Sequence, residues 1–208
     1  LFLSFLKGGV HMELGDLEQE ISHAFFDKLS ESGVLFSKVY AANTTSEIGN
    51  ATLFSGYTGV PESPLPLFTE KHRNITTLSD LLKNAGYSTS YLFSGDLKYG
   101  NIKGFLTEHH FDRLQDENDF NPTLPRGKLN YYDSDLYDKF LGEIKKNKQP
   151  FLSCTFTGST HFPYDCPMRK FPFHGEEADY LNSMVYADDC LRQFFNKVKK
   201  NAFNFLWL

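Results

Sequence analysis

Apolar residues recur at four-residue spacing between residues 17 and 30, at Leu17, Ile21, Phe25 and Leu29. This spacing places them on one face of a helix. Similar segments alternate along the chain with short runs of β-branched and aromatic residues, which are typical of buried strands. The pattern predicts helices at 17–30, 44–54, 76–85, 133–148 and 177–200. It predicts strands at 1–6, 34–42, 87–93, 151–156 and 202–208.

Helices that alternate with strands indicate an α/β fold. We therefore predict a single domain over residues 1–208 with three layers, α/β/α. The sheet should be mostly parallel, with helices on both faces. Because the last predicted strand ends at Leu208 with no element after it, we expect the fold to be incomplete at the C-terminus.

Composition supports a folded domain and excludes one class of partner. Hydrophobic residues make up 40% of the chain and charged residues 23%, which is a globular balance. The formal net charge is −5, and no run of Lys and Arg is longer than pairs such as Lys145-Lys146. The chain therefore lacks the basic patch of a nucleic-acid-binding protein.

Cysteine spacing and hydropathy set two further limits. The three cysteines, Cys154, Cys166 and Cys190, form no CxxC pair, so buried free thiols are favoured over a zinc site or a disulfide framework. The apolar run at Leu1–Leu6 is far shorter than the roughly 20 residues that cross a bilayer. We expect no transmembrane segment within this chain.

The densest candidate chemistry lies where the strand at 34–42 gives way to the helix at 44–54. Three hydroxyl residues, Thr44, Thr45 and Ser46, stand at this junction. Unpaired backbone N–H groups and the helix dipole favour a phosphate or sulfate there. The alternative is that these hydroxyls only cap the helix. Spacing alone leaves both readings open.

Longer sequence segments add a resemblance. The segment LFSKVYAA, a hydroxyl residue three positions before Gly49, and then LFSGYTGVP look like the nucleophile segment of sulfatase-like domains in the alkaline phosphatase superfamily. The branch it resembles contains phosphoglycerol transferases and lipoteichoic acid synthases. Further matches follow in family order: TLSDLLKNAGYSTSYLFSGDLKYGNIKGFL, HHFDRL, LYDKFLGEI, QPFLSCTFTGSTHFPYDCP and YADDCLRQFF. The resemblance implies an alkaline phosphatase-like fold that is truncated in this chain.

The resemblance also implies roles for individual residues. Ser46 occupies the nucleophile position, which is also a metal-ligand position, and Thr45 beside it is expected to bind substrate. His161, after the strand at 151–156, is expected to contact the anionic group of the substrate, although it could be an ordinary loop histidine. Lys98 and Asn101, after the strand at 87–93, are expected to line the pocket, although a solvated loop is the plainer reading of Lys98.

Members of the family hold one or two divalent metals, so Mn, Zn or Mg is implied as a cofactor. The family has a carboxylate ligand at the end of the first strand, where this chain has Lys7. Glu13 is the candidate replacement, with Asp16 as a second choice. The family's Asp-His pair would follow Leu208, beyond this sequence. We therefore expect metal binding and turnover to be weak or absent in this chain.

No cysteine here stands in the Cys-x-Pro-x-Arg segment of sulfatases that use an oxidised cysteine. Phosphoryl or phosphoglycerol transfer is thus favoured over sulfate-ester hydrolysis, with an anionic small molecule or lipid headgroup as substrate. The alternatives are a non-catalytic remnant that only binds anions, and an unrelated α/β domain. The resemblance implies a membrane-anchored, extracytoplasmic domain of the cell envelope, and we expect this chain itself to be soluble.

Overall fold

The computed structural model describes residues 25–200, except positions 37, 42, 61, 62 and 173. The predicted strands at 1–6 and 202–208, and the first part of the predicted helix at 17–30, lie outside the described residues. So does Glu13, the candidate metal ligand.

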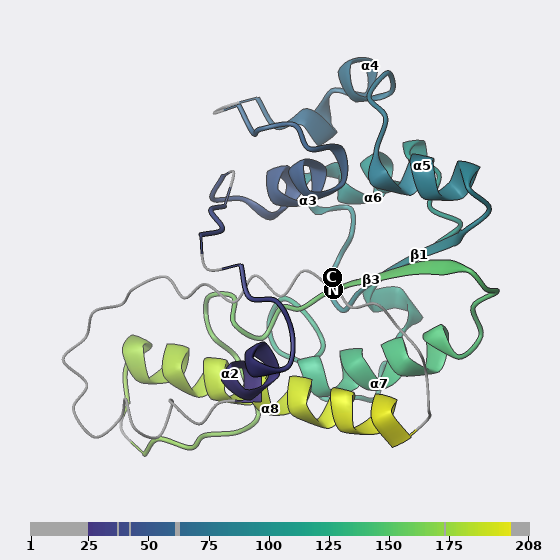
Figure 1. Cartoon of the computed structure of the whole chain (residues 1–208). Coiled ribbons are helices and arrows are strands. Elements are labelled where there is room, and N and C mark those ends of the chain that lie inside the picture. The colour runs from purple at the N-terminus through teal and green to yellow at the C-terminus, as the bar shows by residue number, and fades with distance from the viewer. Residues whose placement is uncertain (1–24, 37, 42, 61–62, 173, 201–208) are drawn as a thin grey trace.

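A parallel sheet forms the middle layer (Figure 1). Its strands are β1 (Ser88–Phe93), β2 (Arg113–Gln115) and β3 (Phe151–Phe156), in the order β2-β1-β3. Tyr91 in the central strand is paired with Leu114 on one side and Cys154 on the other. Because the strands are parallel, their carboxyl ends share one edge of the sheet. The predicted strands at 87–93 and 151–156 are confirmed, and β2 was not predicted.

Helices cover both faces of this sheet. Figure 1 shows α3, α5 and α6 on one side and α2, α7 and α8 on the other. The α-helices are α2 (Phe25–Glu31), α3 (Ser46–Ser55), α4 (Thr69–His72), α5 (Leu78–Asn84), α6 (Ile102–Glu108), α7 (Asp133–Ile144) and α8 (Glu176–Lys200). Short 3-10 helices are η1 (Leu65–Leu67), η2 (Tyr99–Asn101) and η3 (Glu117–Asp119). The predicted three-layer α/β fold is confirmed.

Two clusters of buried hydrophobic residues pack on opposite faces of β1, because successive strand residues point to opposite sides of the sheet. Tyr91 packs in a cluster with Phe54 of α3 and Phe105 of α6. The next residue, Leu92, packs in a second cluster with Phe140 of α7 and Phe194 of α8. The central strand is therefore buried by helices on both sides, as expected for parallel strands, while β2 and β3 are half-buried.

The predicted strand at 34–42 is wrong for its described residues, which form no strand. Their large side chains face solvent: Val34 is 82% exposed, Phe36 76% and Tyr40 86%. A run of β-branched and aromatic residues indicates a tendency to form a strand, but a strand also needs a neighbour for its backbone hydrogen bonds. In the described part of the chain, this segment pairs with no other strand.

The longest helix, α8, has 25 residues, yet charged residues interrupt its apolar positions. Among the described residues, no helix is both long and apolar enough to span a membrane.

Candidate functional site

Ser46 is the first residue of α3, so the predicted helix is confirmed with its start two residues after Thr44, whereas the described residues of the predicted strand before it form no strand. Thr45 is the N-cap, with extended backbone angles of φ −116° and ψ 146°. The first intrahelical hydrogen bond runs from the Gly49 N–H to the Thr45 carbonyl, at 3.0 Å. The backbone N–H groups of residues 46–48 have no helical carbonyl to donate to. Free N–H groups of this kind give a helix start its affinity for anions.

A buried polar chain ties this turn to the sheet. The Tyr91 hydroxyl donates to Oδ1 of Asn50 at 2.6 Å. The Asn50 side-chain amide in turn donates to the Ser46 carbonyl at 2.9 Å. Tyr91 belongs to β1, so the side chains of Tyr91 and Asn50 link the central strand to the start of α3.

The three hydroxyls at the junction differ in their surroundings. Thr44 is exposed, and its backbone N–H donates to Oδ1 of Asn43. Ser46 is partly buried. The Thr45 hydroxyl is buried and lacks a protein hydrogen-bond partner, and it makes no side-chain cap. Thr45 therefore occupies the N-cap position without capping the helix through its side chain, and its hydroxyl is available to a ligand.

Glu47 was missed by sequence reasoning. Its Oε2 is a second buried oxygen without a protein partner in the same turn. The sequence did contain a signal for Glu47, since it is an acidic residue in the first turn of a predicted helix, beside the candidate hydroxyls. Favourable interaction with the helix dipole stabilises a carboxylate at this position.

The segment after β1 packs directly against this turn. A side-chain carbon added at Gly100 would lie 2.5 Å from Cβ of Glu47, so η2 approaches α3 through glycine. Asn101 follows in a left-handed conformation, and its side-chain amide donates to the Pro66 carbonyl at 2.6 Å. Lys98 is exposed; its backbone N–H donates to Oδ1 of Asp96, and its carbonyl accepts from the Asn101 N–H. The structure thus packs η2, which ends at Asn101, against α3, with the Asn101 amide already bonded, and Lys98 directly precedes η2.

His161 ends a tight turn that follows β3. Its backbone N–H donates to the Gly158 carbonyl at 3.0 Å. Its ring Nδ1 lies 2.7 Å from the Phe162 carbonyl oxygen. A carbonyl only accepts, so Nδ1 carries a proton and Nε2 remains for a ligand. Nε2 can donate to an anion only when the ring is protonated. His161 is exposed and lies in the loop that follows the carboxyl end of β3.

The described residues include no group of three or more His, Cys, Asp or Glu side chains that could hold a metal ion. The metal ligands predicted for the chain are Ser46 and Glu13, and only Ser46 is described. Thr45 and Glu47 add two unpartnered oxygens to this turn, which is too few for the ligand set of a divalent metal. The described residues therefore do not assemble a metal site by themselves.

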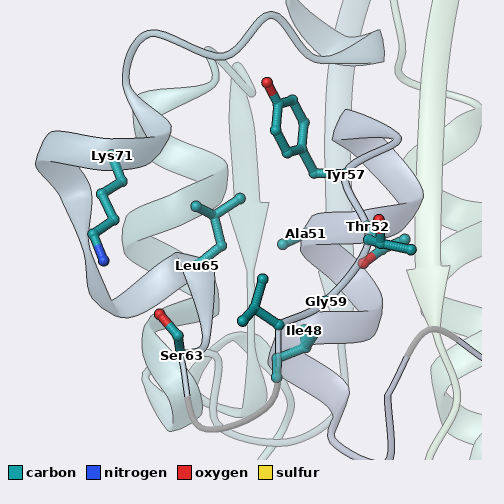
Figure 2. A pocket seen from close by; sticks show the side chains of 10 residues that line it. Ile48, Ala51, Thr52, Tyr57, Gly59, Ser63, Leu65 and Lys71 are labelled. Carbon is teal, nitrogen blue, oxygen red and sulfur yellow. The ribbon is translucent and has the colours of Figure 1, made fainter.

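A cavity of about 200 Å³ lies along the side of α3, with Ile48 of the first turn among its lining residues (Figure 2). Figure 2 shows Ala51 of α3 and Leu65 of η1 among its lining side chains. Lys71 is the cation among the lining residues, and its ammonium group lies 4.0 Å from the centre of the Phe68 ring. The cavity is mostly apolar, and Thr45, Ser46 and Glu47 are not among its lining residues.

The parallel sheet between two helical layers, with hydroxyl residues at the start of α3, defines a three-layer α/β protein. A family model described as Sulfatase matches residues 10–205, and the chain belongs to that family.

Its curated relatives include phosphoglycerol transferase I of Escherichia coli. One such sequence is 23% identical over 201 residues, covering 86% of this chain and 26% of the relative. Another is 26% identical over 134 residues, covering 59% of this chain and 18% of the relative. The chain therefore spans only about a fifth to a quarter of the length of these relatives.

Solved structures support the same fold. A protein in the alkaline phosphatase superfamily from Vibrio parahaemolyticus matches with a TM-score of 0.74 and 29% identity, covering 84% of this chain and 44% of that one. The lipoteichoic acid synthase LtaP from Listeria monocytogenes matches with a TM-score of 0.64 and 23% identity, covering 74% of this chain and 40% of that one. A zinc complex of the periplasmic domain of EptC from Escherichia coli matches with a TM-score of 0.53 and 18% identity, covering 85% of this chain and 52% of that one.

Proposed function

We propose that this chain is the nucleophile-bearing part of a phosphoglycerol transferase or phosphoester hydrolase. The observation that carries the proposal is the pair of hydroxyls, Thr45 and Ser46, at the start of α3. Free amides of the first helical turn would stabilise the negative charge that develops on the phosphoryl oxygens. The relationship to phosphoglycerol transferase I supports a phosphodiester substrate.

The reaction would proceed in two displacements. The hydroxyl oxygen attacks phosphorus and loses its proton, while the bond to the leaving alcohol breaks and that alcohol gains a proton. Water or an acceptor hydroxyl then attacks the phosphorylated residue and restores the free hydroxyl. A divalent metal such as Mn, Zn or Mg would lower the pKa of the attacking hydroxyl when bound. The described residues do not complete the site for such a metal.

Ser46 is the nucleophile that the family resemblance implies. Thr45 is its rival, because its hydroxyl is the one that is buried without a partner. A buried hydroxyl that makes no hydrogen bond to protein carries a desolvation cost of about 1–3 kcal/mol, which a bound ligand or metal would relieve. Both assignments place the attacking oxygen in the same turn, and one experiment separates them.

The experiment measures hydrolysis of bis-p-nitrophenyl phosphate with added Mn²⁺ and traps the phosphorylated residue for mass spectrometry. Loss of at least about a hundredfold in turnover is expected for Ser46→Ala if Ser46 is the nucleophile, and for Thr45→Ala if Thr45 is. Thr44→Ala is the matched control, since its exposed hydroxyl lies outside the turn. Turnover that survives in the Thr45→Ala, Ser46→Ala double variant would exclude a nucleophile at this junction.

His161, Lys98 and Asn101 would bind the anionic part of the substrate. Protonated His161 would donate from Nε2 to a phosphoryl oxygen, and Lys98 would add positive charge beside η2. The substrate class would be an anionic small molecule or lipid headgroup. By relationship, we also propose that the chain works outside the cytoplasm, in the cell envelope.

The second candidate is a protein that binds phosphate without turnover. It is favoured by the lack of a metal-binding group among residues 25–200 that are described. Calorimetry with inorganic phosphate separates the two functions. Binding without hydrolysis, in the presence of Mn²⁺ or Zn²⁺, would support the binding function and exclude catalysis by this chain.

A further inference from the structure

Two loops at the carboxyl edge of the sheet carry the proposed substrate-binding residues. One follows β1 and leads to Lys98 and Asn101, and the other follows β3 and ends at His161. Residues 130–133, here called the edge segment, contact both loops. This segment leads into α7 and lies outside the residues that the proposed function uses.

The edge segment is bonded to the end of β1. The Tyr131 N–H donates to the Ser94 carbonyl at 3.0 Å, and the Ser94 hydroxyl donates to the Tyr131 carbonyl at 2.9 Å. Asn130 and Gly95 form an isolated antiparallel bridge beside these bonds. Ser94 is 0% exposed, so these bonds are shielded from water.

Asp133 bonds the same segment to the end of β3. Its Oδ1 accepts from the Gly158 N–H at 3.0 Å and from the Ser159 N–H at 3.3 Å. The Asp133 N–H donates to the Ser159 hydroxyl at 3.1 Å. Asp133 and Ser159 are each 1% exposed, so this reciprocal set is fully buried.

These bonds hold the first two residues of the turn that ends at His161, whose N–H donates to the Gly158 carbonyl. The turn also fits tightly, because a side-chain carbon at Gly158 would lie 2.7 Å from Oδ1 of Asn130. The position of the His161 backbone relative to β1 therefore depends on the edge segment.

We propose that Asp133 is a positioning residue that fixes the His161 turn for anion binding, with the edge segment setting its distance from the loop after β1. This inference rests on the proposed role of His161 in substrate binding. Asp133 acts through the turn and touches no substrate.

A plainer role for Asp133 is to stabilise α7 by its charge, since it lies in the first turn of that helix. The hydrogen bonds indicate that Asp133 acts through its acceptor oxygen Oδ1 and not through its charge. Only Oδ1 is used, and Oδ2 is buried without a partner. Burial raises the pKa of Asp133, which favours the neutral carboxyl over the carboxylate.

Three substitutions separate these roles. Asp133→Asn keeps the acceptor Oδ1 and removes the charge. Asp133→Ala removes both. Asp135→Asn is the matched control, because Asp135 lies in the same helical turn and makes none of the hydrogen bonds to the His161 turn.

The first measurement is amide hydrogen exchange of the full chain. Exchange at Gly158 and Ser159 should accelerate by about ten- to a hundredfold in Asp133→Ala, and should stay near wild type in Asp133→Asn and Asp135→Asn. If Asp133→Ala fails to fold, Ser159→Ala replaces it, since it removes one bond of the set. Unchanged exchange in the folded variants, or equal acceleration in Asp135→Asn, would overturn the inference.

The second measurement is the affinity for inorganic phosphate. Asp133→Ala should weaken it about tenfold, and the same change in a His161→Ala background should weaken it no further, since the effect passes through His161. Equal weakening in both backgrounds would show a general structural role and overturn the inference. If phosphate does not bind, or His161→Ala binds it as wild type does, the proposed function of His161 fails, and amide exchange alone decides whether Asp133 holds the turn.

Discussion

His72 Nδ1 lies 3.2 Å from His109 Nε2, and both rings are buried, with 0% and 2% exposure. His109 Nδ1 lies 3.0 Å from Oδ2 of Asp80, which accepts. The His109 ring therefore carries a proton on Nδ1, and a single proton on either His72 Nδ1 or His109 Nε2 forms the bond between the two rings. The last nitrogen of this chain, His72 Nε2, is buried without a protein partner. These side-chain contacts connect α4, α5 and the end of α6. Burial favours the neutral form of His72.

The neutral state of His72 predicts a loss of stability in mild acid. Burial, reinforced by the neighbouring His109, lowers the pKa of His72 from its ordinary value of 6.5. The unfolded chain then binds more protons than the folded chain below about pH 6.5, so the free energy of unfolding decreases as the pH falls through that range. The decrease levels off below the folded-state pKa. Urea unfolding between pH 8 and pH 5 measures it.

The control for this prediction compares two histidines. His72→Leu should flatten the pH dependence in this range, whereas His174→Ala should leave it as in wild type, since His174 is exposed. A wild-type profile in His72→Leu would place the titrating group elsewhere.

Thr77 caps α5 in a way that predicts a measurable cost of substitution. The Asp80 N–H donates to the Thr77 hydroxyl at 3.3 Å, and the Thr77 N–H donates to Oδ2 of Asp80 at 2.8 Å. Thr77→Ala should lower the free energy of unfolding by about 1–2 kcal/mol. Thr76→Ala is the control, because Thr76 is exposed one position earlier and should change stability by less than about 0.5 kcal/mol. Equal effects of the two substitutions in denaturant melts would contradict the capping role.

Asp80 predicts a separate loss of stability in stronger acid. Burial alone would raise its pKa, but hydrogen bonds from His110, Thr77 and His109 outweigh burial and lower the pKa from 3.8 to about 2. The ionised carboxylate therefore stabilises the fold fully above pH 3.8, and the contribution is lost as the pH falls toward 2. Its size is about 2 kcal/mol. The difference in unfolding free energy between wild type and Asp80→Asn should shrink over this range, and a constant difference would refute the prediction.

Most long elements could be predicted from the sequence because their signals are local. The spacing of apolar residues identified α7 and α8, and the run FLSCTF identified β3 at its observed bounds. The shorter α6 and β2 were missed. Glycines flank and interrupt α6, at Gly100 and Gly104, and β2 has only three residues, so neither shows a clear period.

The site was predictable only in part, for the same physical reason. The position of Ser46 at a helix start depends on its neighbours in sequence, and the structure places it there. The approach of Gly100 to Glu47 and the bonds between Asp133 and Ser159 join residues far apart in the chain. No local pattern encodes such contacts, so the buried, unpartnered oxygen of Glu47 and the bonds of Asp133 emerged only from the fold. The roles of Ser46, Thr45 and His161 stay predictions.

The link from Tyr91 through Asn50 to Ser46 predicts that a sheet residue controls the α3 turn. Tyr91→Phe removes the donor to Oδ1 of Asn50 and leaves that oxygen without its partner in a residue that is 8% exposed. The free energy of unfolding should fall by about 1–3 kcal/mol. Exchange of the α3 amides from Gly49 onward, where the helical hydrogen bonds begin, should accelerate more than exchange in α7, because the Asn50 side chain that holds the Ser46 carbonyl is released. Tyr99→Phe is the control, since Tyr99 is 67% exposed. If Tyr91→Phe lowers stability but loosens α3 and α7 equally, the hydroxyl contributes to the core without positioning the candidate nucleophile.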